Sequence, residues 1–152
     1  MSKKGREVFK EFKIKGSHIS IDLFNKGDVK DLERKFSKAQ YELDEAVKHD
    51  TEPYVPFRTG NLSNTVNMTE SGSGQIIYYG PQARYLYYGK VMVSPTTGSS
   101  YAALGEKKVL TKKQLQYDRK AHPLAGAMWF DRSEKANRKE WIKAAQEGFR
   151  NG

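Results

Sequence analysis

The fold is decided by residues 56–89, which read PFRTGNLSNTVNMTESGSGQIIYYGPQARYLYYG. Thr59 favours a helix N-cap, because its hydroxyl can accept a hydrogen bond from a backbone N–H in the first turn. Leu62 and Val66 then lie four residues apart, on one face of the helix. The sequence therefore predicts a short helix here, with Gly60 constrained by the turn into it and Leu62 buried beneath it.

The same stretch continues with a hairpin signal and a second short helix. The Ser-Gly-Ser-Gly run at residues 71–74 tolerates positive φ, and residues 66–69 and 75–79 on either side are rich in strand-forming types. A β-hairpin is predicted there. Residues 83–88 suffice for about one and a half helical turns, and Gly89 can end them in the left-handed conformation.

Two periodic stripes predict the long helices. After Asp28, which favours an N-cap, apolar residues recur at spacings of three and four until Pro53, where a helix cannot continue. A final helix begins at Asp131 or Ser133. The first stripe consists of Val29, Leu32, Phe36, Ala39, Leu43 and Ala46 or Val47, and the final helix carries Arg138, Trp141, Ala145 and Phe149 at helical spacing.

Shorter elements complete the expected fold. Ile19, Ile21 and Leu23 alternate with polar residues, which is typical of a half-buried strand, and residues 90–94 indicate another short strand. Residues 101–122 are basic and have no clear period, which fits either a long hairpin or a projecting loop. The order of elements indicates an α+β fold, with a small mainly antiparallel sheet packed against a long N-terminal helix and a C-terminal helix.

Composition fits one domain with a thin core. The chain has 152 residues, of which 37% are hydrophobic, and its mean hydropathy is −0.81. We expect residues 1–152 to form a single domain that is ordered in part by its neighbours. A flexible basic arm is expected at residues 1–17 and an exposed basic loop insertion at residues 95–122. No apolar run of about 18 residues and no signal peptide is evident, so we expect a protein made and kept in the cytoplasm, or carried in an assembly built there.

The net charge of +9 is concentrated in two segments. Residues 1–15 and residues 106–120 each carry +4, from six basic and two acidic residues in both cases. This charge suits contact with nucleic acid, but it equally suits an acidic protein neighbour or solubility alone. The candidate partner contacts in the second segment are Lys107, Lys108, Lys112 and Lys113.

The residue types that catalysis needs are absent or badly spaced. No cysteine occurs, which excludes disulfides, thiolate metal sites and cysteine nucleophiles. His18, His49 and His122 are scattered and have no second ligand at metal-binding spacing. Nucleophile elbows, phosphate-binding loops and dinucleotide-binding glycine patterns are missing. We therefore predict that the protein is not an enzyme, with no catalytic residue, metal or cofactor.

The acidic residues of the first long helix could include a general acid–base pair. They are Glu42, Asp44, Glu45, Asp50 and Glu52, and most lie off the apolar stripe, so we interpret them as the solvated side of the helix. Asp31 with Lys35, and Asp44 with Lys48, have the spacing of ion pairs within a helix.

Five of the nine tyrosines gather beside Arg84. They could stack on bases, but successive residues of a strand or short helix point in different directions, so at most half of them share a surface. Positions in the core or at a subunit interface are the favoured interpretation. The tyrosines are Tyr78, Tyr79, Tyr85, Tyr87 and Tyr88.

Arg58 is either a capping or ion-pairing residue or an inter-subunit contact. Arg58 and Arg84 are both candidate partner contacts.

Two motifs resemble those of tailed-phage minor capsid proteins, in the tail-completion or head–tail joining (neck) group. A Pro-x-x-Thr-Gly-x-Leu element is matched by Pro56, Thr59, Gly60 and Leu62, and a Tyr-Ala-x-Tyr-x-x-Tyr-Gly type element resembles Ala83, Tyr85, Tyr88 and Gly89. The resemblance covers residues 19–149. The chain departs from the pattern at Arg58, where an acidic residue is frequent, at residues 83–85, where Ala-Arg-Tyr replaces Tyr-Ala, and in the basic loop between Ser94 and Pro123.

The resemblance implies a non-enzymatic structural virion protein, a minor capsid or neck component that joins head to tail and is assembled in the host cytoplasm. It implies a ring of copies of the chain, six by the family pattern, that contacts other neck proteins such as the connector and the tail terminator. DNA contact is compatible with this role but not required, and no membrane partner is expected. The alternative is a small basic nucleic-acid-binding module that uses Arg84, the tyrosine cluster and the Lys-rich loop.

Overall fold

A computed structural model describes residues 26–152, so the arm expected at residues 1–17 and the strand expected at residues 19–23 lie outside the described residues. In chain order the elements are helix α1 (Lys26–Thr51), a 3₁₀ turn (Glu52–Tyr54), α2 (Asn61–Thr65), a 3₁₀ turn (Val66–Met68), α3 (Ala83–Tyr88), β1 (Lys90–Val93), β2 (Val109–Gln114) and α4 (Trp129–Asn151). The predicted α+β class, with a long N-terminal helix, a C-terminal helix and an antiparallel sheet, is confirmed.

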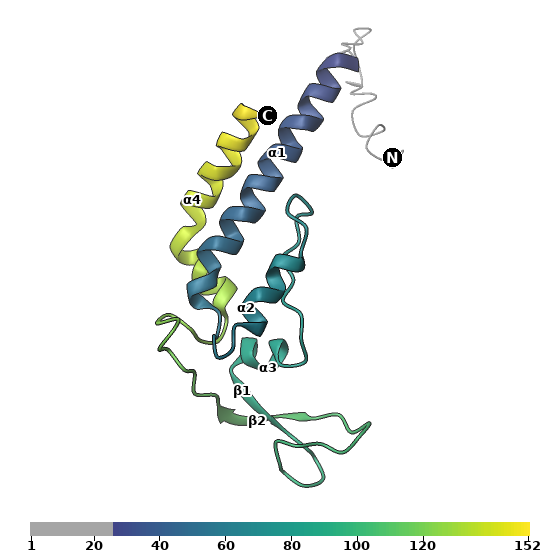
Figure 1. Ribbon diagram of the computed structural model, residues 1–152, viewed down its shortest axis with the longest axis vertical. Helices are drawn as coiled ribbons and strands as arrows, with labels where there is room; N and C mark the ends of the chain where they lie inside the picture. Colours follow the sequence, from purple (N-terminus) through teal and green to yellow (C-terminus); the bar gives the residue numbers. More distant parts are fainter. Residues whose placement is uncertain (1–25) are drawn as a thin grey trace, which may run out of the picture.

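The molecule is elongated, and a pair of helices forms one half of it. Figure 1 shows α1 and α4 running side by side in opposite directions, with α2 and α3 beside the lower end of α1. The β1–β2 hairpin lies beyond that end, so it is far from the C-terminus of α4. No helix among residues 26–152 has both the length and the apolar character needed to cross a bilayer.

Helix α1 follows the predicted apolar stripe but begins earlier than expected. It starts at Lys26, so Asp28 lies in the first turn, where its charge favours the positive end of the helix dipole, and is not the cap. The helix ends at Thr51, two residues before Pro53, as predicted. The predicted ion pair of Asp31 with Lys35 is present at 3.1 Å.

Close contact between α1 and α4 depends on a glycine in α4. A Cβ atom at Gly148 would lie 2.9 Å from the Ala39 Cα and 3.0 Å from the Lys38 carbonyl oxygen, so a larger residue would push the helices apart. The pair is also tied by polar contacts, because the Trp141 Nε1 donates to the Asp50 carboxylate at 2.9 Å. Helix α4 begins at Trp129, two residues before the predicted start at Asp131.

The core is small and lies below the helix pair. Its centre consists of the buried residues Val55, Leu62 and Trp129. Against these pack the partly buried Tyr54, Tyr78, Ala83, Leu86 and Tyr87. The predicted burial of Leu62 is thus confirmed, and Val66, in the 3₁₀ turn that follows α2, is buried as well.

The cap of α2 differs by one residue from the prediction. Gly60, not Thr59, occupies the N-cap position, with a φ of 80°, and the Asn64 N–H donates to its carbonyl oxygen at 2.8 Å. A Cβ atom at Gly60 would lie 3.1 Å from the Phe57 ring. A left-handed backbone packed against a ring favours glycine, so the turn leaves Thr59 exposed and outside the cap position.

The prediction of a β-hairpin around residues 71–74 is wrong. Residues 66–68 continue α2 as a 3₁₀ turn, and residues 75–79 are not in a strand. Side chains replace the missing ladder: the Thr69 Oγ1 donates to the Ile77 carbonyl oxygen at 3.1 Å and accepts from the Ile77 N–H at 3.2 Å. Residues 66–68 form their backbone hydrogen bonds within the 3₁₀ turn, so they cannot pair with a neighbouring strand.

A hairpin does form later in the chain. Strands β1 and β2 are antiparallel, with Met92 opposite Leu110 and Val93 opposite Val109. Residues 101–122 supply only one strand of this hairpin, because β2 pairs with β1 outside the stretch, and the expected loop insertion at residues 95–122 thus includes a strand. The hairpin base is joined to α3, whose C-cap is the predicted Gly89 with a φ of 71°.

Candidate assembly surfaces

The two halves of the family-like motif meet in the core. Leu62 and Ala83 belong to one cluster, and Gly60 and Gly89 turn the chain on either side of it. At Gly89 a Cβ atom would lie 2.7 Å from the Ala127 Cβ, so the site excludes any larger residue. These positions therefore shape the fold. The rest of the motif is more accessible: Pro56 and Tyr85 are partly buried, and Thr59 and Tyr88 are exposed.

The five tyrosines do not form one platform. Tyr78 and Tyr87 both pack edge-on against Trp129, with ring centroids 5.5 and 4.7 Å from it. Burial, together with a hydrogen bond to the Asp131 carboxylate at 2.9 Å, raises the pKa of Tyr87 to about 12. Burial also raises the pKa of Tyr78. Tyr79 and Tyr88 are exposed, so the structure divides the cluster between core and surface.

An apolar groove runs between α1 and α4. Its volume is about 510 Å³. Phe36 and Ile142 lie along it with 55% and 50% of their surfaces exposed, although Phe36 belongs to the stripe predicted to face the core. The other lining residues are Ala39, Gln40, Leu43, Glu134, Arg138, Trp141, Ala145, Gln146 and Phe149. This α1–α4 groove is a surface that nothing in the described chain fills.

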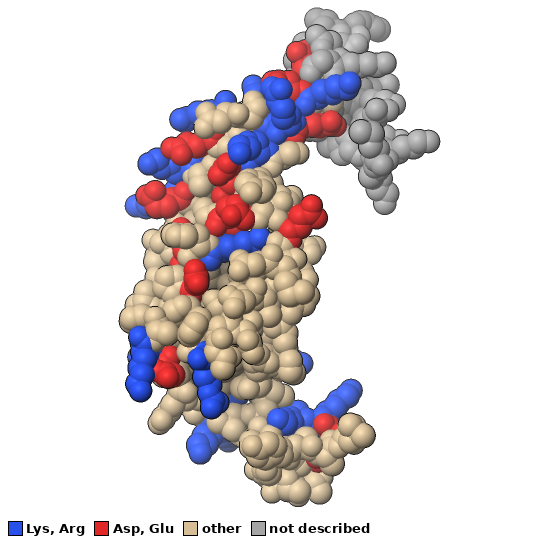
Figure 2. Space-filling view, in the orientation of Figure 1, with Lys and Arg blue, Asp and Glu red and all other residues tan. Residues whose placement is uncertain are grey.

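A second hollow adjoins the first. It also has a volume of about 510 Å³, and Arg84, Tyr88 and Phe130 are among its lining residues. The Phe130 ring stacks on Trp141, with centroids 5.9 Å apart, and so links the hollow to the α1–α4 groove. Figure 2 shows a broad surface without charged residues across the middle of the molecule, below the charged side chains of the helix pair.

The tip of the β1–β2 hairpin presents two apolar side chains to solvent. Tyr101 is 85% exposed and Leu104 is fully exposed. The Glu106 carboxylate holds the loop between the strands, since it accepts from the Ser94 hydroxyl at 2.8 Å, the Thr96 hydroxyl at 2.7 Å and the Ala103 N–H at 3.0 Å. These hydrogen bonds lower the pKa of Glu106 to about 2. The tip is therefore an ordered projection.

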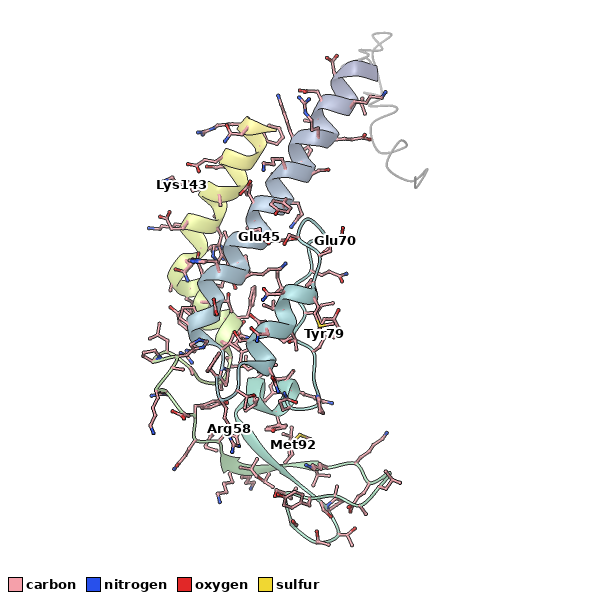
Figure 3. The ribbon with its side chains drawn as sticks, viewed as in Figure 1. Glu45, Arg58, Glu70, Tyr79, Met92 and Lys143 are labelled. Carbon is pink, nitrogen blue, oxygen red and sulfur yellow. The ribbon has the colours of Figure 1, made fainter. Side chains whose placement is uncertain are left out.

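Charged side chains surround this projection. All four candidate lysines are exposed on the hairpin: Lys107 and Lys108 lie just before β2, and Lys112 and Lys113 lie within it. Arg58 and Arg84 are exposed too, and Figure 3 places Arg58 near the base of the hairpin in this view. The structure brings the lysines together on one hairpin but does not bring Arg84 to them, because Arg84 lines the hollow around Phe130.

One acidic residue of α1 is not on a solvated face. Asp44 is 3% exposed, and its carboxylate accepts from the Gly72 N–H at 2.7 Å and the Gly74 N–H at 3.0 Å. The predicted Asp44–Lys48 ion pair is thus replaced, and Lys48 instead donates to the Thr69 carbonyl oxygen at 2.6 Å. The Ser71 hydroxyl donates to Glu45, which Figure 3 shows on the side of α1 that faces this loop. The loop is therefore clamped to α1.

The histidines within the described residues have structural surroundings. His122 pairs through Nδ1 with the Val55 carbonyl oxygen at 2.8 Å, and His49 lies 3.1 Å from Asp50. His18 lies outside the described residues. Between residues 26 and 152 no group of three or more histidine or acidic side chains is placed to hold a metal ion.

Sequence reasoning missed Tyr101, Leu104 and Glu106. They lie in a stretch with no period, and the only available signal was the presence of two large apolar residues in a basic, glycine-containing loop. It also missed Ile142 as a groove residue, because Ile142 follows Trp141 directly and the stripe was assigned to Trp141.

Comparison with known proteins supplies one match. A family model described as minor capsid protein matches residues 18–149. The match covers most of the chain and nearly the same span as the motif resemblance. No curated protein and no solved structure matches the chain.

Proposed function

This chain belongs to the minor capsid protein family and is thus a structural component of the virion, and on that premise we propose that it is a neck component that completes the tail and joins it to the head. It acts there without catalysis, as part of a closed ring of identical copies. The motif resemblance implies a ring of six copies. The geometry of this ring matches the symmetry of the head side to that of the tail.

The observation that carries this proposal is the distribution of apolar side chains. The buried apolar residues of residues 26–152 are few, namely Val47, Val55, Leu62, Val66, Ala125, Trp129 and Trp141. Twice as many large apolar side chains, 14 against seven, are exposed. They include Phe36 and Ile142 in the α1–α4 groove, Tyr88 and Phe130 in the second hollow, and Tyr101 and Leu104 on the hairpin tip. Monomers rarely expose extended apolar patches unless the patches are contact surfaces. A subunit whose surfaces are covered by its neighbours accounts for this distribution.

Unlike neighbours are proposed for the lysine-bearing hairpin. Its four lysines suit an acidic surface, such as one on the connector or the tail terminator. Exposed lysines of this kind also suit DNA passing through a neck, although the proposed role does not depend on DNA contact.

The nucleic-acid-binding alternative has weaker support. It needs the tyrosines to form one stacking surface beside Arg84, whereas Tyr78 and Tyr87 pack on Trp129 in the core. Only Tyr79 and Tyr88 offer largely exposed rings, and the lysines of the hairpin are on a different element.

The test is the assembly of particles that lack this protein. We expect separate heads and tails to accumulate, and we expect added purified protein to restore joining in electron micrographs and in infectivity. Normal infectious particles without the protein would refute the neck role. Tight binding to naked DNA that weakens steeply with salt, combined with normal joining, would favour the alternative.

A further inference from the structure

We propose that the hairpin tip of one copy packs into the α1–α4 groove of the next copy, in a head-to-tail contact. The apolar side chains that meet in this contact are Tyr101 and Leu104 of the tip and Phe36 and Ile142 of the groove. This inference rests on the ring proposed above, because a head-to-tail chain of identical copies uses both surfaces of every copy and can close on itself.

The tip has the properties of a preformed anchor. Tyr101 and Leu104 are almost completely exposed, which is unusual for two large apolar side chains on one ordered loop. The Glu106 carboxylate already holds the loop through the Ser94 and Thr96 hydroxyls and the Ala103 N–H. A loop ordered before contact loses little conformational entropy when it binds, so its apolar burial is converted more fully into affinity.

The groove has the properties of the matching receptor. Its volume of about 510 Å³ accommodates one large aromatic and one aliphatic side chain, and its lining is mostly apolar. Phe36 and Ile142 are half exposed at its edge, so an inserted side chain would cover them as well. Glu134 and Arg138 both line the groove and lie 3.6 Å apart, so the groove has no net charge and its apolar lining carries the fit.

The contact has to join two molecules. The hairpin extends beyond the end of the helix pair that is distant from the C-terminus of α4, whereas the groove lies along the pair (Figure 1). A copy therefore cannot fill its own groove without unfolding the hairpin base. The hairpin tip and the α1–α4 groove are separate patches of one chain, and this arrangement produces a heterologous interface.

The available area indicates a weak pair and a stable ring. A large aromatic side chain buries about 150–250 Å², so two side chains from the tip and two from the groove supply on the order of 600 Å² of apolar surface. A stable interface between two proteins buries about 1,200–2,000 Å² in total. One contact is therefore marginal, but each copy in a closed ring makes two, and no copy can leave without breaking both.

Paired cysteines test the contact directly, because the natural chain contains none. The variant Leu104→Cys with Ile142→Cys is oxidised mildly, both as purified protein over a range of concentrations and in assembled particles. We expect a ladder of disulfide-linked multimers on a non-reducing gel. The matched control is Leu104→Cys with Glu140→Cys, since Glu140 is an exposed residue of α4 that does not line the groove. The control should cross-link at least tenfold more slowly.

Each other outcome overturns the proposal. Equal rates in the two variants, or no multimers in solution or in particles, would show that tip and groove do not meet. A disulfide within one chain would show that the tip reaches its own groove. Cross-linked dimers of the single variant Ile142→Cys at the rate of the double variant would show that two grooves face each other. Circular dichroism confirms folding of each variant.

These results separate the contact from the neck role. If particles need the protein for joining but yield no linkage between positions 104 and 142, the head-to-tail contact is wrong and the neck role stands. If the linkage forms in purified protein but particles without the protein remain infectious, the contact stands and the neck role is wrong.

Discussion

Truncation of Leu62 tests whether the small core below the helix pair holds the molecule together. Leu62 is 5% exposed and packs with Val55 and Trp129, which come from the turn after α1 and from the start of α4. Leu62→Ala therefore leaves a cavity where three parts of the chain meet. Helix α2 has little freedom to move into this cavity, because it follows Gly60, whose left-handed backbone packs against the Phe57 ring.

The expected cost follows from this geometry. Leucine-to-alanine changes in cores cost about 2–5 kcal/mol, and the cost is highest where the site cannot collapse. We expect about 3–5 kcal/mol here. The free energy of unfolding of a domain is about 5–15 kcal/mol, so the variant loses a large part of its stability. Its Tm should fall by about 10 °C, given roughly 2–4 °C per kcal/mol for a domain of this size.

Urea unfolding followed by tryptophan fluorescence measures this effect, since Trp129 belongs to the affected cluster and Trp141 lies between the long helices. The matched control is Leu124→Ala, which removes the same atoms from a side chain that is 48% exposed. We expect the control to cost less than about 1 kcal/mol. If both variants unfold at the same urea concentration, the assignment of Leu62 to the core is refuted.

Three further predictions concern the hairpin and the loop clamped to α1. Replacing Lys107, Lys108, Lys112 and Lys113 together by serine should change the free energy of unfolding by less than about 1 kcal/mol, because exposed charges contribute little; unfolding of this variant would place the segment in the core. The Glu106 pKa is lowered from 4.5 to about 2, so its contribution to loop order is complete above about pH 4.5 and is lost as the pH falls towards 2. The NMR shift of the Ala103 amide should titrate near 2, and a midpoint near 4.5 would contradict the hydrogen bonds to Glu106. Asp44→Ala removes the acceptor of two backbone N–H groups and should cost about 2–3 kcal/mol in urea unfolding, whereas Glu33→Ala, exposed on the same helix, should be nearly neutral.

The periodic parts of the fold could be predicted from the sequence, because a helix repeats its buried face every three or four residues. The stripe through Val47 and the one through Trp141 therefore located α1 and α4. The ends of helices depend on single residues, and there the predictions were less accurate. Thr59 is the better cap by residue type, but the next position has a left-handed backbone packed against the Phe57 ring, which favours glycine, and that contact is not visible in a sequence pattern.

The loop at residues 71–74 shows a different limit. Its glycines permit a hairpin turn, and the prediction assumed that the flanking residues pair with each other. The backbone N–H groups of Gly72 and Gly74 instead bond to Asp44, 28 and 30 residues earlier in the chain. A carboxylate that meets the same residues from a neighbouring helix is a long-range contact, and neither local spacing nor β-propensity indicates it.

The proposed head-to-tail contact predicts that the subunit stays apart from its copies until assembly. The thin core follows from the low apolar content, and it leaves the α1–α4 groove and the hairpin tip uncovered. If these surfaces were one continuous patch, two copies would bury both at once and form a tight dimer in the cell. Because they lie on separate elements, one pair buries only one of the two surfaces of each copy and is expected to remain weak. On this proposal, a template that holds several copies in place closes the same contacts into a ring, since the second contact of each copy then forms at high effective concentration. The proposed contact therefore predicts assembly on a partner in preference to assembly in solution, because the two surfaces lie on separate elements.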